Sequence, residues 1–394
     1  MDMTENKNQI LYEERVNRIV KAMQLQEPDR VPLIPPEEGY WAGPYAGHSV
    51  ADVTYDYSLL AKAWEKIFVD FPEWDAAYAP YCVWSGPMFE FAGITQFTLA
   101  GKDGADQKMH QWNQVSCMSE DEYGELIADP YKFMLEKILP RRCRELAKPY
   151  PTNAMAFGKA FQEYLGWLGY WGAKGAEWKD KFGMPVLAGG FTETPIDFLM
   201  DHLRGFKELS MDLLKLPKET VKQACEALLP YMIKWATTGT QPNLSTPIFI
   251  PLHFAPFISP KYFKEFYWPT FKKLIDTLTD LGYGVIIYCE SNWTPHLHYL
   301  KELPKGKVIV EFETMDMKEA KKEIGDTVCL MGNLPYELLV YGTKEKIEDY
   351  TKKLIDEAAP GGGFIMSADK IFGENVNPKC VRYWCDAVVK YGQY

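Results

Sequence analysis

The second half of the chain alternates between short apolar runs and longer amphipathic stretches. From residue 184 onward, six runs are rich in Val, Ile, Leu and Phe: PVLAGGF, PIFIPLH, GVIIYCE, KVIVEFE, TVCLMGN and GGFIMSA. Short apolar runs of this kind are typical of strands that are buried on both faces, as in a parallel sheet. The stretches between them, such as residues 264–282 and 343–363, have the apolar spacing of helices and end in glycine.

This alternation predicts repeated strand–helix–strand units. Two earlier runs, RVPLIP at residues 30–35 and WDAAYAP at residues 74–80, bring the predicted strands to eight. We therefore predict an α/β fold, a (β/α)8 TIM barrel, with a doubly wound open sheet as the alternative. The first thirty residues predict a helical N-terminal extension. No linker rich in Pro or Ser divides the chain, so we treat residues 1–394 as a single domain.

Composition and charge narrow the function. The chain has 394 residues, of which 47% are hydrophobic, enough for a substantial core. Its formal net charge of −11 argues against nucleic acid or an anionic membrane as a partner. The N-terminus is polar, and no apolar run approaches the roughly 18 residues of a membrane span. We therefore expect a cytoplasmic protein.

Local motifs exclude further classes. The eight cysteines are scattered without a CxxC pair, and there is no export signal. This pattern argues against disulfides and against a structural zinc knuckle. The chain has no GxGxxG or GxxxxGK[ST] motif, so dinucleotide and P-loop nucleotide binding have no support.

Polar side chains at strand ends are the candidates for chemistry, because the loops of a (β/α)8 barrel converge at the carboxyl ends of its strands. His253 and Glu290 end their apolar runs, and Cys329 lies within another. Three such ligands with one open position are the arrangement of catalytic zinc, and a thiolate favours zinc over magnesium. The pattern suggests zinc held by His253, Glu290 and Cys329, with Glu313 or Cys289 as substitutes.

Each of these residues also has an ordinary structural interpretation. His253 could be a hydrogen-bonded histidine at a strand edge, Glu290 a strand-end charge paired with a lysine, and Cys329 a core residue. The spacing between them is long and forms no local motif. The constellation by itself leaves both interpretations open.

Several segments resemble the uroporphyrinogen decarboxylase superfamily. In chain order they are PDRVPLIP, FPEWDAAY, VLAGGFTETP, SPKYFKEFYWPTFKKLID, GDTVCLMGNLP and APGGGFIMSADKIFGENVNP. The resemblance runs from near the N-terminus to the C-terminus and implies a (β/α)8 barrel, in agreement with the strand count. The superfamily contains decarboxylases and corrinoid-dependent methyltransferases, so the fold does not decide the chemistry.

Departures from the family pattern distinguish these branches. The decarboxylases resemble one another in an early arginine-rich segment that grips a polycarboxylate substrate. The corresponding stretch here, PLIPPEEGYWAG, has Glu37 and Glu38 and no arginine, which argues against uroporphyrinogen decarboxylation. The thiol-methylating branch carries a His-x-Cys pair where this chain has Ile287, Tyr288 and Cys289, so only a variant zinc site is expected.

The segments IIYCESNW and CLMGNLP look most like the O-demethylase methyltransferases of the corrinoid-dependent branch. This resemblance implies transfer of a methyl group from a methoxylated aromatic compound, a phenyl methyl ether, to the cob(I)alamin of a partner corrinoid protein. It also implies that Glu290 is a catalytic metal ligand and that zinc polarises the ether oxygen. A homodimer that buries the opposite end of the barrel is compatible with this reaction.

Such a site has to seat an aromatic ring beside the metal and exclude water. The side chains that we expect to contact the substrate are Tyr40, Trp41, Trp84, Phe191, Tyr288, Trp293 and Asn333. Two alternatives stay open: methyl transfer involving a methylated amine or thiol, and a metal-free binding barrel without catalysis.

Overall fold

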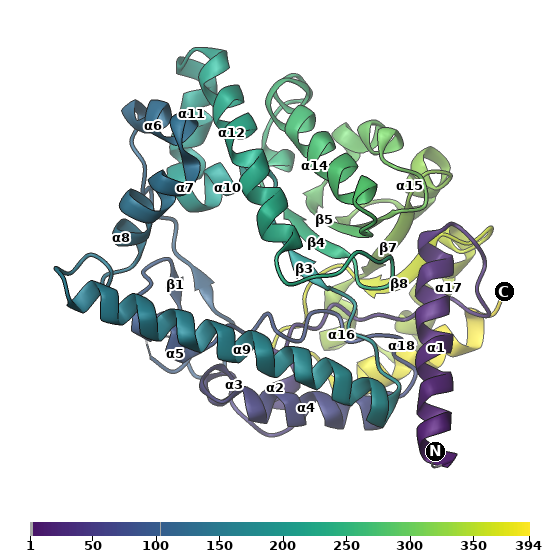
Figure 1. Cartoon of the computed structure of the whole chain (residues 1–394). Coiled ribbons are helices and arrows are strands. Elements are labelled where there is room, and N and C mark those ends of the chain that lie inside the picture. Colours follow the sequence, from purple (N-terminus) through teal and green to yellow (C-terminus); the bar gives the residue numbers. More distant parts are fainter. Residues whose placement is uncertain (1–2, 103) are drawn as a thin grey trace.

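The computed structural model describes residues 3–102 and 104–394 and shows a barrel of parallel strands surrounded by helices (Figure 1). Six strands form one parallel sheet in the order in which they occur along the chain. They are β3 (Gly190–Phe191), β4 (Ile248–Leu252), β5 (Val285–Asn292), β6 (Val308–Thr314), β7 (Cys329–Leu334) and β8 (Phe364–Ala368). Pairing of each strand with the next is the topology of repeated βα units with right-handed crossovers.

Two short extended segments complete the barrel between β8 and β3. Leu33 forms a parallel bridge with Met366 of β8, and Ala77 forms one with Val186, just before β3. The two segments also pair with each other, since Asp75 N–H donates to Leu33 O at 2.9 Å. The predicted strands at residues 30–35 and 74–80 therefore occupy the two remaining positions. The TIM-barrel prediction is confirmed, and the open-sheet alternative is wrong.

The helices lie outside the strands, with α12, α14, α15, α17 and α18 around the barrel (Figure 1). The main helices are α1 (Met3–Met23), α3 (Val50–Tyr55), α4 (Tyr57–Asp70), α5 (Gly86–Ala92), α6 (Tyr123–Ala128), α7 (Pro130–Phe133), α8 (Leu139–Arg142), α9 (Thr152–Phe182), α10 (Pro195–Phe198), α11 (Phe206–Lys215), α12 (Lys218–Thr237), α14 (Trp268–Asp280), α15 (Met317–Ile324), α16 (Tyr336–Tyr341), α17 (Lys344–Ala358) and α18 (Pro378–Tyr391). In the described chain, no helix combines the length and the apolar character needed to cross a membrane, although α9 has 31 residues.

Two apolar layers hold the barrel together. The inner layer fills the barrel and includes Ile286, Tyr288 and Met331, while the outer layer packs the strands against the helices and includes Cys289. Residues i and i+2 of a strand share a face, which is why Tyr288 and Cys289 fall in different layers. The last turns of α1 close the amino-terminal end of the barrel, because Met23 belongs to the inner layer.

The long segment between the second barrel segment and β3 is helical for most of its length. It contains α5 to α9 and a small antiparallel pair, β1 (Phe97–Thr98) with β2 (Gln111–Trp112). The hydrophobic pattern did not define the order of these elements, because α9 buries only Ala156, Trp167, Trp171 and Trp178, too few positions for the usual apolar stripe of a helix. Figure 1 shows α9 running along the edge of the molecule beside α3, α4 and α5.

A buried carboxylate connects the first three elements of the fold. Asp75 is buried and accepts hydrogen bonds from the guanidinium of Arg18 in α1, from both Nη atoms of Arg30 at 2.8 and 2.9 Å, and from Leu33 N–H at 2.7 Å. The cluster joins α1 to the first two barrel segments. A buried charge of this kind is tolerated because every lone pair has a donor.

Removing the carboxylate leaves two guanidinium groups without their buried partner, so Asp75→Ala should lower the free energy of unfolding by about 3–5 kcal/mol. Urea denaturation followed by circular dichroism measures this change. The matched control is Asp356→Ala, which breaks the exposed pair with Lys352 and should cost less than about 1 kcal/mol. Equal effects of the two substitutions would contradict this account of the cluster.

Candidate active site

The carboxyl ends of β4 and β5 bring two of the predicted ligands together. His253 directly follows β4, and Glu290 lies near the end of β5. Leu252 of β4 pairs with Cys289 of β5, so the next residue of each strand lies at the same level of the barrel. His253 Nε2 and Glu290 Oε1 are 3.6 Å apart.

A third residue, Asp201, fixes the histidine ring. His253 Nδ1 donates a hydrogen bond to Asp201 Oδ2 at 2.6 Å, which leaves Nε2 on the side of Glu290. Asp201 lies in the π-helical turn η3 (Leu199–Arg204), which continues α10. A carboxylate that holds one ring nitrogen while the other faces the site is typical of metal-ligating and proton-transferring histidines.

Sequence reasoning missed Asp201, although a signal was present. Asp197 and Asp201 are spaced i, i+4 in the helical segment that follows the β3 run, so they lie on one face of it. That segment starts at the carboxyl end of a barrel strand, where catalytic residues collect.

Charge at the site is set by burial and by the close carboxylates. Burial disfavours the imidazolium of His253, but the carboxylates of Asp201 and Glu290 outweigh it and raise the pKa of His253 well above its usual value. Burial raises the pKa of Glu290, and the charge of His253 partly opposes this.

Asp197 supports the loop that carries the histidine. Its Oδ1 accepts Phe254 N–H at 2.8 Å, and its Oδ2 accepts the hydroxyls of Tyr267 at 2.5 Å and Thr194 at 2.8 Å. Asp197 is fully buried, and burial raises its pKa to about 6. Because one acceptor binds the residue next to His253, Asp197 fixes the backbone from which the imidazole projects.

The barrel interior contains a further acid, Glu311 of β6. It is buried and accepts hydrogen bonds from Tyr78 Oη at 2.5 Å and Ser367 Oγ at 3.2 Å. Burial raises the pKa of Glu311 to about 8 and that of Glu38, in the loop after the first barrel segment, to about 7. The charge of Glu290 contributes to the shift of Glu38, which places these two acids near each other.

The prediction that Cys329 is the third zinc ligand is wrong. It is the first residue of β7 and pairs with Ile309, near the start of β6. Its side chain is buried in the inner apolar layer, toward the amino-terminal end of the barrel. The carboxyl end of β7 is instead at Asn333 and Leu334. A run of apolar letters does not show where a strand begins, and this displaced the cysteine from His253 and Glu290.

The two substitute ligands are not placed for metal binding either. Cys289 is buried in the outer layer, on the side of β5 that faces the helices. Glu313 accepts Ser291 N–H at 2.5 Å and lies 3.4 Å from Lys370 Nζ. Within residues 3–102 and 104–394, no three His, Cys, Asp or Glu side chains form a group that could hold a metal ion. His253 and Glu290 supply two such ligands.

Two of the aromatic residues expected at the substrate lie in the outer core instead. Trp41 is buried, donates from Nε1 to Val376 O at 2.9 Å and stacks on Tyr45. Trp293 is buried against Phe263. Both predictions are wrong, because both rings fill space between the strands and the helices.

The remaining predicted substrate contacts have the following places. Tyr40 Oη donates to Cys82 O at 3.3 Å, Trp84 stacks on Trp167, Phe191 packs against the inner layer, Tyr288 Oη donates to Asp369 O at 3.0 Å, and Asn333 Nδ2 donates to Met315 O at 2.9 Å. Substrate contact by these five stays a prediction.

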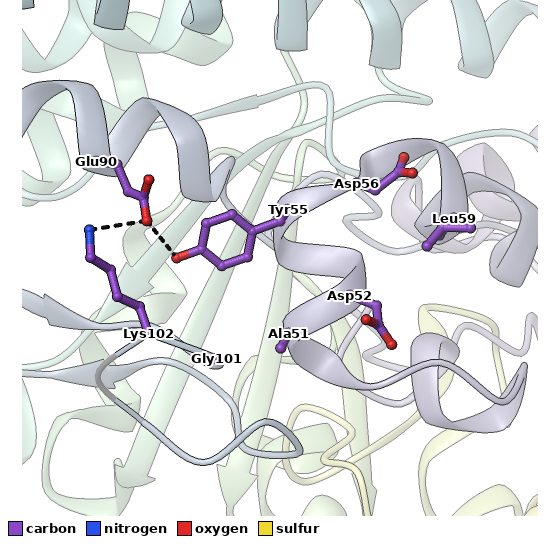
Figure 2. A pocket seen from close by; sticks show the side chains of 8 residues that line it. All are labelled: Ala51, Asp52, Tyr55, Asp56, Leu59, Glu90, Gly101 and Lys102. Atoms are coloured by element: carbon purple, nitrogen blue, oxygen red, sulfur yellow. Dashed lines mark hydrogen bonds and ion pairs between the residues drawn. The ribbon is translucent and has the colours of Figure 1, made fainter.

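A surface hollow lies apart from the strand ends (Figure 2). It is formed mainly by α3, α5 and the turn after β1, and its lining includes Tyr55, Glu90 and Lys102. Glu90 binds both Tyr55 Oη at 3.2 Å and Lys102 Nζ at 3.0 Å. The hollow contains neither histidine nor cysteine, so we locate the chemistry at His253 and Glu290.

Comparison with known proteins identifies the family of this chain. Residues 176–391 match the family described as Uroporphyrinogen decarboxylase (URO-D). The chain belongs to the uroporphyrinogen decarboxylase family. The matched region includes β3 to β8, and with them His253, Glu290 and Asp201.

The sequence matches to individual decarboxylases of this family are short. The uroporphyrinogen decarboxylases of Thioalkalivibrio sulfidiphilus and Pseudoalteromonas atlantica are 29% and 32% identical over 79 and 78 residues. Each match covers 20% of this chain and 22% of the relative, so the chain matches about a fifth of their length. A methyltransferase from Methanosarcina mazei has the same fold, with a TM-score of 0.63, 15% identity, and coverage of 96% of this chain and 98% of that chain.

Backbone hydrogen bonds accommodate the acid Glu37 in the loop where the decarboxylases are expected to carry arginines. It is buried, and its Oε1 accepts the backbone N–H groups of Gly39 at 2.6 Å, Ala42 at 3.0 Å and Trp41 at 3.3 Å. Burial outweighs these donors and raises its pKa to about 8. Glu37 therefore shapes the loop from within.

The raised pKa of Glu37 makes stability depend on pH. The unfolded glutamate titrates near 4.3, so the native state holds its proton more tightly and loses stability as pH rises from about 4.5 to 8. In Glu37→Gln this loss should be smaller by about 1–3 kcal/mol between pH 5 and pH 8. Urea midpoints at several pH values measure it. Identical pH slopes for wild type and variant would contradict a neutral Glu37.

Proposed function

We propose that this protein transfers a methyl group from a methoxylated aromatic compound to the cob(I)alamin of a separate corrinoid protein. The observation that carries the proposal is the pairing of His253 and Glu290 at 3.6 Å, with Asp201 behind the imidazole, at adjacent strand ends of a barrel of this family. The shared fold with a methyltransferase from Methanosarcina mazei supports it.

The loop after the first barrel segment supports methyl transfer over decarboxylation. Glu37 is committed to backbone N–H groups, and Glu38 is a half-buried acid whose raised pKa partly reflects the charge of Glu290. A substrate with many carboxylates would meet acids there instead of the arginines that bind carboxylates well. A neutral methoxyarene avoids this repulsion.

Demethylation of an aryl ether requires help at the ether oxygen, because phenolate is a poor leaving group when its charge is not stabilised. Asp201 holds His253 in one orientation, with Nε2 3.6 Å from the Glu290 carboxylate, so a substrate bound there would meet both groups together. Tyr288 of β5 and Phe191 of β3, the strands on either side of β4, supply apolar surface against which a ring could be seated with water excluded.

His253 and Glu290 can serve as two of the ligands of a zinc ion. Zinc–nitrogen and zinc–oxygen bonds of about 2.0–2.2 Å at tetrahedral angles place two ligand atoms roughly 3.4 Å apart, close to the 3.6 Å between His253 Nε2 and Glu290 Oε1. The Asp201 bond to Nδ1 is the usual support of a metal-binding imidazole. We propose that His253 and Glu290 hold a zinc ion, which when bound would polarise the ether oxygen as a Lewis acid.

The zinc proposal predicts a difference between the two proposed ligands and Cys329. Zinc per chain, measured by mass spectrometry after dialysis, should fall at least about 10-fold in Glu290→Gln and in His253→Gln. Cys329→Ala should retain the wild-type content, because the thiol lies at the other end of its strand. Loss of zinc from Cys329→Ala alone, or no zinc in the wild type, would contradict this assignment.

The reaction is tested by mixing the protein, cob(I)alamin and a panel of methoxyphenols without oxygen, and following methylcobalamin by its absorbance. Glu290→Gln and His253→Gln should lower the rate about 100-fold, and Asp201→Asn about 10–100-fold. The control Glu319→Gln makes the same chemical change at an exposed position of α15 and should leave the rate unchanged. No methylcobalamin from any methoxyphenol would contradict the proposed donor.

A methylated amine is the second candidate donor, and the acids around the site favour it. Glu38, Asp197, Asp201 and Glu290 lie close enough to influence one another or His253. Carboxylates beside aromatic rings are a common environment for methylated ammonium groups. Including methylated amines and thiols in the panel distinguishes these donors, since only one class should give methylcobalamin.

A further inference from the structure

Helix α9 exposes a long apolar face to solvent. Four large side chains on it are strongly exposed: Phe157 at 46%, Phe161 at 51%, Leu165 at 52% and Leu168 at 44%. The opposite side of the helix is anchored, with Trp178 against Phe68. Helical spacing puts these four residues on one side with Gly169, Gly172 and Ala176. We refer to these seven residues as the outer face of α9.

The outer face carries no charge that would keep it in water. Between Phe157 and Ala176, a stretch that the structure describes throughout, Lys159 is the only exposed charged residue of α9, and helical spacing turns it away from this face. Glu163 and Lys174 are half-buried and engaged, Glu163 with Ser85 and Lys174 with Glu65 and Glu177. Contiguous apolar patches on a monomer are rarely larger than a few hundred Å² and commonly mark interaction sites.

The large and the small residues of this face are separated along the helix. Phe157, Phe161 and Leu165 occupy the N-terminal half, and Gly169, Gly172 and Ala176 the C-terminal half. In the described chain a Cβ built on Gly169 or Gly172 would meet no atom within 4 Å, so no contact inside the protein requires glycine there. Glycine is unfavourable in a helix interior unless another surface approaches closely.

We propose that the outer face of α9 is the interface with a second copy of this chain, formed by two antiparallel α9 helices about a twofold axis near residues 166 and 167. This arrangement places Phe157 opposite Ala176, Phe161 opposite Gly172 and Leu165 opposite Leu168 of the second copy. The large half of each helix then covers the small half of the other, the self-complementarity that a twofold interface requires.

The area is sufficient for a small specific interface. At the exposures of 44–52%, the four large side chains leave roughly 400 Å² accessible on each chain. The glycines, Ala176 and flanking backbone add to this along a helix of 31 residues, bringing the face toward the roughly 600–800 Å² that each partner buries in a specific complex. A corrinoid protein gives no comparable reason for the separation of large and small residues.

The first test is the oligomeric state of the full-length chain, measured by sedimentation over a wide concentration range. The wild type should dimerise, and the double variant Phe161→Glu, Leu165→Glu should raise the dissociation constant at least about 30-fold, because four carboxylates would be desolvated. Leu214→Glu, on an exposed position of α11, is the matched control and should remain dimeric. Circular dichroism establishes that each variant is folded.

The second test fixes the direction of the helices. A short bismaleimide should link Phe161→Cys chains to Gly172→Cys chains when the two are mixed, above the background of the wild-type thiols. Phe161→Cys alone should not be linked, because its two copies lie about 16 Å apart along the axis. A monomeric wild type, a dimer unaffected by the double variant, or efficient linking of Phe161→Cys to itself would each overturn the proposal.

Discussion

The parallel register between β4 and β5 is the constraint on which the site depends. Leu252 pairs with Cys289, so His253 and Glu290, the next residue on each strand, come to the same level. Alternation along β5 turns Tyr288 into the barrel and Cys289 toward the helices. A slip of one residue would reverse these directions and remove Glu290 from the imidazole.

Burial also changes what the acids of this protein can do. Glu311 and Glu37 have pKa values raised to about 8, and Glu38 and Glu193 to about 7. These carboxyls are partly protonated at neutral pH, so the net charge of the chain is less negative than the formal −11. The proton of Glu311 allows an acid to lie beside Tyr78 in an otherwise apolar interior without a cationic partner.

The helical segment between the second barrel segment and β3 runs from the carboxyl end of the barrel to the edge of the molecule. The tryptophan side of α9 packs near the loop after the second barrel segment, where Trp84 stacks on Trp167 and Ser85 donates to Glu163 at 2.8 Å. The other side of the same helix is the apolar face described above. A second copy bound to that face would therefore stiffen a helix that supports the loop beside the site. Helix α9 would then have two roles: its tryptophan side packs near the loop, and its outer face would bind the second copy.

The sequence by itself determined the fold class and the positions of His253 and Glu290 at strand ends. Both follow from local patterns, since apolar runs and amphipathic stretches reflect burial along one segment at a time. Tertiary structure decided the rest. It placed Cys329 at the start of β7, buried Trp41 and Trp293 in the outer core, and brought Asp201 to the imidazole. These outcomes depend on strand ends, on register and on contacts between segments distant in sequence, which no single segment encodes.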